Sequence, residues 1–297
     1  MNVIRISAIG GLGNQLFIWN LAHLLESKYN CKIKIYFPKS RSNRKCEISK
    51  LKEFCNHRIE VTESNRLGYA FGVLNRIIRK FPKIGSLINN LFSVVQTNLP
   101  SETFYLTANP PRFVNGYFQS TKLVEENWNS YKDELILATK TIVEVANFRE
   151  LTEISGKMIH IRRGDFVENK KSVGLLSIEY FSKQVKTGEK VTIFTDAVSS
   201  DPEIEKSFPS ALIFDGDSLD TWTSFSLLSQ ARHLIISNST FSWWAGMISI
   251  TRGGIVVAPQ PWTLTNVYGA NHLHNTKFQY TDSIFEQDNS QNTYPWR

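Results

Sequence analysis

The 297-residue sequence has few cysteines and no long apolar segment. Its three cysteines, Cys31, Cys46 and Cys55, are an odd number, and the absence of a C-x-x-C pair argues against a disulfide scaffold or a zinc framework. A reducing compartment suits this composition. No apolar run approaches the length of a membrane span, and the N-terminus lacks the apolar core of a signal peptide. We therefore expect a cytoplasmic protein that is at most peripheral to the inner face of a membrane.

The charge balance points to an anionic partner. The formal net charge is +7, the pI is near 9.2, and hydrophobic residues make up 41% of the chain, which is ordinary for a globular enzyme. The basic residues are dispersed and no nucleic-acid-binding motif occurs, which argues against nucleic acid. The remaining candidates for the anionic partner are a phosphorylated substrate and an anionic membrane surface. Residues 66–92 resemble a basic amphipathic helix, which either covers a core or contacts lipid.

Strand and helix patterns alternate along much of the chain, as in an α/β fold with parallel sheets. The chain opens with a strand over 2–8, a glycine-rich turn, a helix over 15–29 and a strand over 31–37. From residue 157 we expect strands over 157–162, 190–195, 211–214, 233–237 and 254–258, with helices over 177–187, 220–232 and 240–250. The length favours two domains, which we place at 1–150 and 151–297.

The segment Met158–Phe166 carries polar residues at the end of a predicted strand. His160 and Arg162 share one face of that strand because side chains alternate. Open α/β sheets bind ligands at the carboxyl ends of their strands. Arg162 or Arg163 in that place can hold a diphosphate, whereas the alternative is a surface turn with an Arg–Asp pair through Asp165. Two arginines followed by Gly and Asp favour the binding site.

The segment Ser237–Gly246 runs from a strand into the start of a helix. Backbone N–H groups and the dipole at a helix start attract anions, and Ser239 and Thr240 can add hydroxyl donors. Plain helix capping is the alternative, and one helix start can serve both purposes. Trp243 and Trp244 are expected in the core.

Two further motifs are weaker. Gly10–Gln15 follows the first strand, but Leu16 stands where a dinucleotide fingerprint requires its third glycine, so the loop indicates only a close approach of the backbone. Asp215 and Asp217 form a D-x-D after a strand, a pattern that can bind a divalent metal. Asp-Gly is also a favoured turn pair, and we prefer the turn.

Taken in order, these segments resemble family-11 glycosyltransferases, the α-1,2-fucosyltransferases of bacterial surface polysaccharides and animal blood-group antigens. The chain is most similar to the bacterial type. The resemblance covers most of the chain and is carried by residues 10–17, 116–120, 160–165 and 237–244, with Pro261 and Trp262 after the last strand. The third and fourth of these segments are long and specific.

The resemblance implies a GT-B-like fold, in which two Rossmann-type domains are separated by a cleft. GDP-β-L-fucose would bind the C-terminal half, with the acceptor on the N-terminal side. By similarity, the donor-binding residues are Asn14, His160, Arg162, Arg163, Asn238, Ser239, Thr240 and Phe241. Within this set, Arg162 would hold the diphosphate, His160 would lie near the guanine, and Asn14 would lie near the fucose or a phosphate.

The reaction implied by the resemblance is inverting transfer of L-fucose to a sugar hydroxyl, typically the 2-hydroxyl of a galactose. It needs neither a metal ion nor a cofactor, since GDP-fucose is a substrate. Arg162 would offset the charge of the leaving group. Asp165 is the candidate general base, with Glu168 as the second candidate, but Asp165 can equally orient Arg162 through a salt bridge.

The chain departs from the family pattern at two places that bear on guanine recognition. Thr195-Asp196-Ala197 stands where members usually carry Ser-Asp-Asp, and Ser224 stands where they usually carry Asp. Asp220 lies four residues earlier on the same helix face and is a possible substitute for that Asp.

Two alternatives stay open: a metal-dependent glycosyltransferase using Asp215 and Asp217, and a non-catalytic carbohydrate- or nucleotide-binding protein. For the acceptor, a galactose-terminated and lipid-linked oligosaccharide of an O-antigen-type polysaccharide would suit a basic cytoplasmic enzyme.

Overall fold

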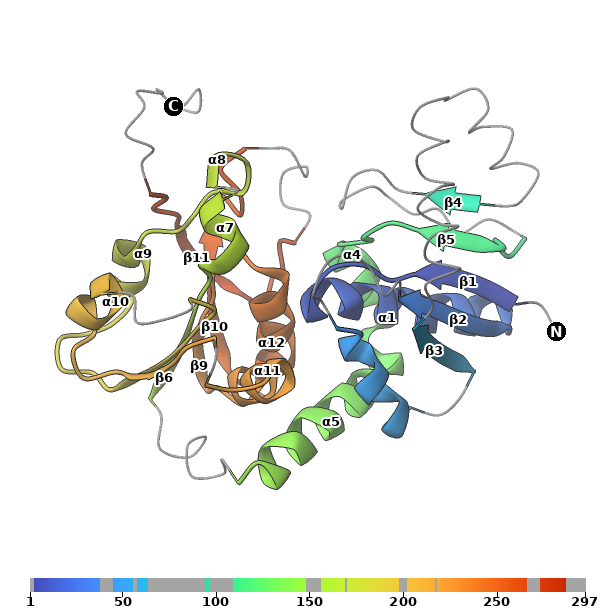
Figure 1. The fold of residues 1–297 in the computed structure, drawn as a ribbon, viewed down its shortest axis with the longest axis horizontal. Coiled ribbons are helices and arrows are strands. Elements are labelled where there is room, and N and C mark those ends of the chain that lie inside the picture. The colour runs from blue at the N-terminus through green and yellow to red at the C-terminus, as the bar shows by residue number, and fades with distance from the viewer. Residues whose placement is uncertain are drawn as a thin grey trace. The chain divides into compact units, whose positions relative to one another are not determined.

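The computed structural model describes residues 3–37, 45–55, 58–63, 94–96, 109–147, 156–168, 170–197, 202–216, 218–265 and 273–286. The chain divides into two compact units, residues 1–141 and 142–297. Each unit is built on one parallel sheet with helices packed against it (Figure 1). The predicted α/β fold with two Rossmann-type units is therefore confirmed. The expected boundary near residue 150 and the expected basic helix over 66–92 lie outside the described residues.

The N-terminal unit has a five-stranded sheet in the order β3-β2-β1-β5-β4, and all neighbours are parallel. Its strands are β1 (Val3–Ser7), β2 (Lys32–Phe37), β3 (Ile59–Glu63), β4 (Val94–Gln96) and β5 (Phe113–Asn115). Its helices are α1 (Leu12–Tyr29), η1 (Glu47–Glu53), α4 (Thr121–Asn127), η2 (Trp128–Ser130) and α5 (Lys132–Val145). The opening β-loop-α-β pattern is as predicted, whereas β3 and β4 were not expected.

The C-terminal unit has a six-stranded parallel sheet in the order β11-β10-β9-β6-β7-β8. Its strands are β6 (Lys157–Ile161), β7 (Val191–Thr195), β8 (Leu212–Phe214), β9 (His233–Ile235), β10 (Ile255–Gln260) and β11 (Gln279–Asp282). Its helices are α7 (Gly164–Glu168), α8 (Lys170–Val173), α9 (Ile178–Ser182), α10 (Pro202–Ser207), α11 (Thr221–Ser229) and α12 (Thr240–Thr251). Numbered from β6, this is the 3-2-1-4-5-6 order of a Rossmann sheet.

Several predicted elements differ in extent from those observed. The helix expected over 177–187 ends at Ser182, and Gly188 follows in the left-handed region with φ 77°. Strand β5 ends at Asn115, and the backbone then leaves the extended region at Gly116 with φ 152° and at Phe118 with φ 53°. After β2, residues 47–53 form η1, which buries Ile48 and Leu51.

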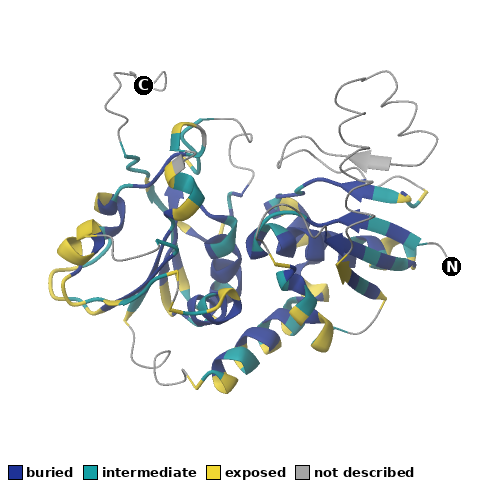
Figure 2. Ribbon diagram, in the orientation of Figure 1, coloured by how far each residue is buried: buried dark blue, intermediate teal, exposed yellow. Residues whose placement is uncertain are grey.

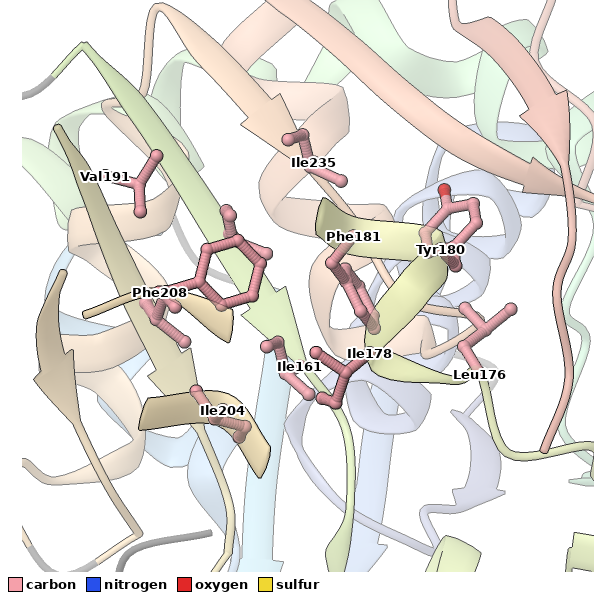
Figure 3. Close-up of a cluster of buried hydrophobic side chains, with 11 residues drawn as sticks. Ile161, Leu176, Ile178, Tyr180, Phe181, Val191, Ile204, Phe208 and Ile235 are labelled. Atoms are coloured by element: carbon pink, nitrogen blue, oxygen red, sulfur yellow. The ribbon is translucent and has the colours of Figure 1, made fainter. Parts of the chain in front are cut away.

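In the C-terminal unit, successive side chains of β6 lie on opposite faces of the sheet. Ile159 and Ile161 of β6 pack with Phe181 of α9 and Ile204 of α10 (Figure 3). Since side chains alternate along a strand, His160 faces the opposite side of the sheet. There its ring contacts Phe241 of α12. The strands and the helix surfaces turned toward them are buried, and exposed residues lie mainly on the outer helix faces (Figure 2).

Helix α1 is buried around most of its circumference, and a polar residue lies inside it. Gln15 is fully buried, and its amide nitrogen donates to the carbonyls of Gly10 and Lys45, each at 2.9 Å. Its amide oxygen accepts from the N–H of Ile48 at 3.1 Å. One side chain thus joins the glycine-rich loop to the start of η1.

No helix in the described ranges is both long and apolar enough to cross a membrane.

We expect Gln15→Leu to lower the free energy of unfolding by about 3 kcal/mol. The substitution keeps the side-chain volume but leaves three backbone groups without their partners, and each orphaned group costs about 1–3 kcal/mol. Chemical denaturation measures the change. The control is Gln279→Leu at an exposed position of β11, expected within about 0.5 kcal/mol of wild type. Equal effects of the two substitutions would contradict the structural role of Gln15.

Candidate functional site

The strand order of the C-terminal unit places polar residues at one point of the sheet. Strands β6 and β9 are neighbours although β7 and β8 lie between them in the chain. The strand order therefore reverses there, and open α/β sheets bind ligands at the carboxyl ends of strands around such a reversal. His160 and Arg162 stand at the end of β6, Asp196 follows β7, and Ser237 and Asn238 follow β9.

Arg162 is held between two carboxylates. Its Nη2 lies 2.5 Å from Asp165 Oδ1, and its Nη1 lies 2.6 Å from Asp196 Oδ2. The guanidinium carbon also lies 5.4 Å from the centre of the Phe166 ring. Nε of Arg162 is buried and has no hydrogen-bond acceptor among the described residues. The guanidinium therefore has a fixed position, and one of its N–H donors is unpaired among the described residues.

Asp196 fixes the main chain of the same turn. Its Oδ1 accepts from the backbone N–H of Arg163 at 2.6 Å. Gly164 has φ 28°, and a Cβ placed on it would lie 2.3 Å from Asp196 Oδ2. A side chain at residue 164 would therefore have to adopt a left-handed backbone conformation and displace the Asp196 carboxylate. We did not identify Asp196 as a site residue from the sequence, although its place at the end of a strand in a parallel sheet was a usable signal.

Arg163 is engaged in the interior. It is buried, its Nη1 donates to the carbonyl of Leu176 at 2.8 Å, and its Nη2 lies 3.5 Å from the carboxylate of Glu286. These contacts connect the end of β6 to the loop before α9 and to the segment after β11. The guanidinium of Arg163 therefore binds groups inside the protein. This geometry gives no support to the prediction that Arg163 contacts the donor.

His160 is a neutral, buried ring. Its Nδ1 lies 2.9 Å from Ser237 Oγ, across the point where the strand order reverses, and its ring centre lies 5.2 Å from that of Phe241. Burial, and secondarily the charge of Arg162, lowers the pKa of His160 from 6.5 to about 3. The ring therefore acts as a hydrogen-bonding and packing group and carries no positive charge at neutral pH.

The start of α12 is capped as its sequence predicts. Ser239 Oγ accepts from the N–H of Phe241 at 3.3 Å, and Thr240 is the first helical residue. Asn238 donates from Nδ2 to the carbonyls of Val173 and Gly174, and its Oδ1 is buried without a partner among the described residues. The helix start thus presents its dipole at the same edge as Arg162.

The two tryptophans of this segment, Trp243 and Trp244, are fully buried, as predicted.

The carboxyl edge of the N-terminal sheet has its own polar pair. Strands β1 and β5 are neighbours although β2, β3 and β4 lie between them in the chain, and Gln119, which follows β5, donates to Asn14 Oδ1 at 2.9 Å. Gly10 has φ 82°, and a Cβ on it would lie 2.4 Å from Asn14 Nδ2. The loop 10–15 and the segment 116–120, which are far apart in the sequence, therefore meet at one site.

Asp215, considered for a metal, and Asp220, considered for guanine, both make local hydrogen bonds. Asp215 Oδ1 accepts from the N–H of Ser218 at 2.9 Å and from its hydroxyl at 2.5 Å, which closes the turn that Asp-Gly favours. Asp220 caps α11, since its Oδ1 accepts from two backbone N–H groups and its Oδ2 accepts from the hydroxyl of Thr223. Asp217 and the side chain of Glu168 lie outside the described residues.

Known proteins match this chain across both of its units. The profile of the family described as "Glycosyl transferase family 11" matches residues 3–274. Two Escherichia coli proteins are similar over most of their length. "O-antigen biosynthesis glycosyltransferase WbnK" is 26% identical over 292 residues, 86% of this chain and 94% of that protein. "Alpha-1,2-colitosyltransferase" is 24% identical over 287 residues, 88% of this chain and 93% of that protein.

Solved structures resemble the chain at low sequence identity. A family 9 glycosyltransferase from Veillonella parvula DSM 2008 has a TM-score of 0.49 at 11% identity, covering 97% of this chain and 88% of that chain. The fucosyltransferase NodZ from Bradyrhizobium has a TM-score of 0.45 at 12% identity, covering 84% of this chain and 94% of that chain.

We expect the stabilising effect of His160 relative to His160→Gln to shrink as the pH falls. The folded ring takes up a proton only near pH 3, whereas the unfolded ring is protonated below about pH 6.5. The wild type therefore loses up to about 1.4 kcal/mol of unfolding free energy per pH unit below that value, a loss the variant escapes. Urea denaturation of both proteins at pH 7 and pH 4 measures it. A constant difference would contradict a neutral buried ring.

Proposed function

The chain belongs to glycosyltransferase family 11, and on this premise we propose that it transfers L-fucose from GDP-β-L-fucose to a sugar hydroxyl, with inversion and without a metal ion. It is a glycosyltransferase, like its O-antigen relative from Escherichia coli. The observation that carries the donor assignment is Arg162, held at the reversal of the C-terminal sheet with a buried Nε–H that is unpaired among the described residues.

The diphosphate of the donor suits the groups gathered at this edge. A guanidinium binds phosphate oxygens with strong, charge-assisted hydrogen bonds, and the start of α12 adds a favourable dipole. When the bond between the sugar C1 and the phosphate oxygen breaks, negative charge grows on the departing GDP. Arg162 and the helix start stabilise that charge in advance of the reaction, which is the role a metal ion has in other enzymes.

The charge balance around Arg162 suggests what happens when the donor binds. Arg162 with Asp165 and Asp196 carries one excess negative charge, which opposes a diphosphate. Asp165 is the more exposed partner, with 42% of its side chain accessible against 26% for Asp196. In our proposal Arg162 keeps Asp196 and exchanges Asp165 for the diphosphate. The released Asp165 carboxylate then takes the proton of the acceptor hydroxyl as that oxygen attacks C1.

The donor sugar has one specific competitor. The second Escherichia coli relative is a colitosyltransferase, and colitose is L-fucose without its 3-hydroxyl group. Both sugars can be attached to the same nucleotide diphosphate, so the contacts of Arg162 do not distinguish them. Comparing initial rates with GDP-fucose and GDP-colitose decides between them. A preference for colitose would change the sugar and leave the diphosphate site as described.

The acceptor we propose is a galactose-terminated oligosaccharide of an O-antigen-type polysaccharide, modified at its 2-hydroxyl. The name of the first relative supports the polysaccharide. Asn14, which we expect near the fucose or a phosphate of the donor, is hydrogen-bonded to Gln119 at the N-terminal sheet edge, and amides can both donate to and accept from the hydroxyls of either sugar. A lipid-linked acceptor would bring the enzyme to the inner face of the membrane, and sedimentation with anionic vesicles tests that part.

We expect GDP to bind in buffer containing a chelator, more tightly than UDP, and Arg162→Ala to weaken GDP binding by about 10- to 100-fold. The range corresponds to the 1.5–3 kcal/mol typical of hydrogen bonds to charged groups. Isothermal titration calorimetry measures all three affinities without requiring an acceptor. Arg232→Ala is the matched control, since this exposed arginine precedes β9 at the opposite sheet edge.

Two results would count against the assignment. Binding only with added Mg²⁺ or Mn²⁺ would favour the metal-dependent alternative through Asp215 and Asp217. GDP binding without transfer to any member of an acceptor panel would favour a binding protein without catalytic activity.

We expect Asp165→Asn and Asp196→Asn to separate the two roles. Asp165→Asn should leave GDP binding intact and lower kcat by about 100-fold or more, because general-base catalysis contributes about 10²–10⁴. Asp196→Asn should weaken GDP binding by about tenfold, because Arg162 loses the carboxylate that positions it. Calorimetry and steady-state kinetics on both variants give the comparison. Equal loss of GDP affinity in both would make Asp165 a second positioning residue.

A further inference from the structure

Three side chains of different chemistry converge in the N-terminal unit, outside the sites described above. They are His23 on α1, Cys55 in the turn after η1 and Glu134 in the first turn of α5. One ligand atom from each residue lies within 4.8 Å of the other two. Residues 23, 55 and 134 are too far apart in the sequence for any local motif to reveal the cluster.

The distances fit a tetrahedral metal site. Zinc binds imidazole nitrogen and carboxylate oxygen at about 2.0–2.2 Å and thiolate sulfur at about 2.3 Å, so tetrahedral ligand atoms lie about 3.3–3.7 Å apart. His23 Nε2 and Glu134 Oε2 are 3.5 Å apart, which already satisfies this spacing. The thiol sulfur of Cys55 lies no more than 4.8 Å from each of these two atoms, so it must move closer to both when the ion binds.

The cluster is held in a largely buried and aromatic environment. The imidazole of His23 stacks on Tyr131 with ring centres 5.0 Å apart and meets the edge of Trp19 at 5.2 Å. Glu134 Oε2 is buried and makes no hydrogen bond within the described part of the chain. A buried carboxylate oxygen without a hydrogen-bond donor gains strongly from a cation.

We propose that His23, Cys55 and Glu134 bind a zinc ion that joins α1, the turn after η1 and the start of α5. A thiolate, an imidazole and a carboxylate form a donor set that zinc accepts, with a water molecule in the fourth position. Cys55 and Glu134 are only partly buried, which leaves room for that water. The ion stabilises the N-terminal unit and takes no part in the transfer reaction, so this proposal is independent of the proposed function.

Cobalt titration of the full-length protein, stripped of metal by a chelator, tests the proposal. We expect wild type to show the near-ultraviolet thiolate-to-cobalt charge-transfer band and the visible bands of tetrahedral Co²⁺. Zn²⁺ should abolish these bands and raise the midpoint of thermal unfolding by mass action. Cys55→Ser should lose the charge-transfer band. The control Cys31→Ser, which removes a buried thiol outside the cluster, should retain it.

The cobalt titration of the wild-type protein tests the site directly, so the result does not depend on whether a variant folds. Absence of the charge-transfer band in wild type would overturn the site and leave a protonated cluster in which the Cys55 thiol bonds to Glu134. Persistence of the band in Cys55→Ser, or its loss in Cys31→Ser, would assign the thiolate elsewhere and equally overturn it. None of these readouts involves GDP, so a failed zinc site and a failed donor site are distinguishable.

Discussion

The contact between Asp196 and the turn after β6 is the interaction on which the C-terminal site depends. One carboxylate accepts from the guanidinium of Arg162 and from the backbone N–H of Arg163. It also approaches residue 164 so closely that a side chain there would have to displace it. Side chain and main chain are therefore positioned by the same group. A ligand that meets Arg162 finds a charge already oriented, and orientation before the reaction is what makes electrostatic stabilisation effective.

In both units, polar side chains follow the carboxyl ends of strands of the parallel sheet. Each sheet places side by side two strands that are far apart in the chain, β1 and β5 in one unit and β6 and β9 in the other, and polar residues follow these strands. The chemistry placed there differs, because the N-terminal edge carries the amides Asn14 and Gln119 whereas the C-terminal edge carries Arg162 and two carboxylates. Amides match neutral hydroxyl groups, and a guanidinium matches a diphosphate. In the function we propose, the guanidinium edge would bind the anionic donor.

Burial determines the protonation state of His160 and the contacts of Arg163. His160 is kept neutral beside an arginine, so it supports the site through its contacts with Ser237 and Phe241 rather than through charge. Arg163 is directed into the interior toward Leu176 and Glu286. Two adjacent arginines in one motif thus have different tasks, because Arg162 pairs with Asp165 and Asp196 whereas Arg163 is buried against Leu176 and Glu286.

The sequence by itself determined the α/β class, most strands and helices of the C-terminal unit, and the segments around Arg162 and Ser239. Those features follow from local periodicity and helix-start chemistry, which a single stretch of chain contains. Only the tertiary structure decided the strand order, the partnership of Asp196 with Arg162, and the meeting of His23, Cys55 and Glu134. These depend on contacts between residues far apart in the chain, and packing of whole helices and strands, rather than local pattern, brings such residues within bonding distance.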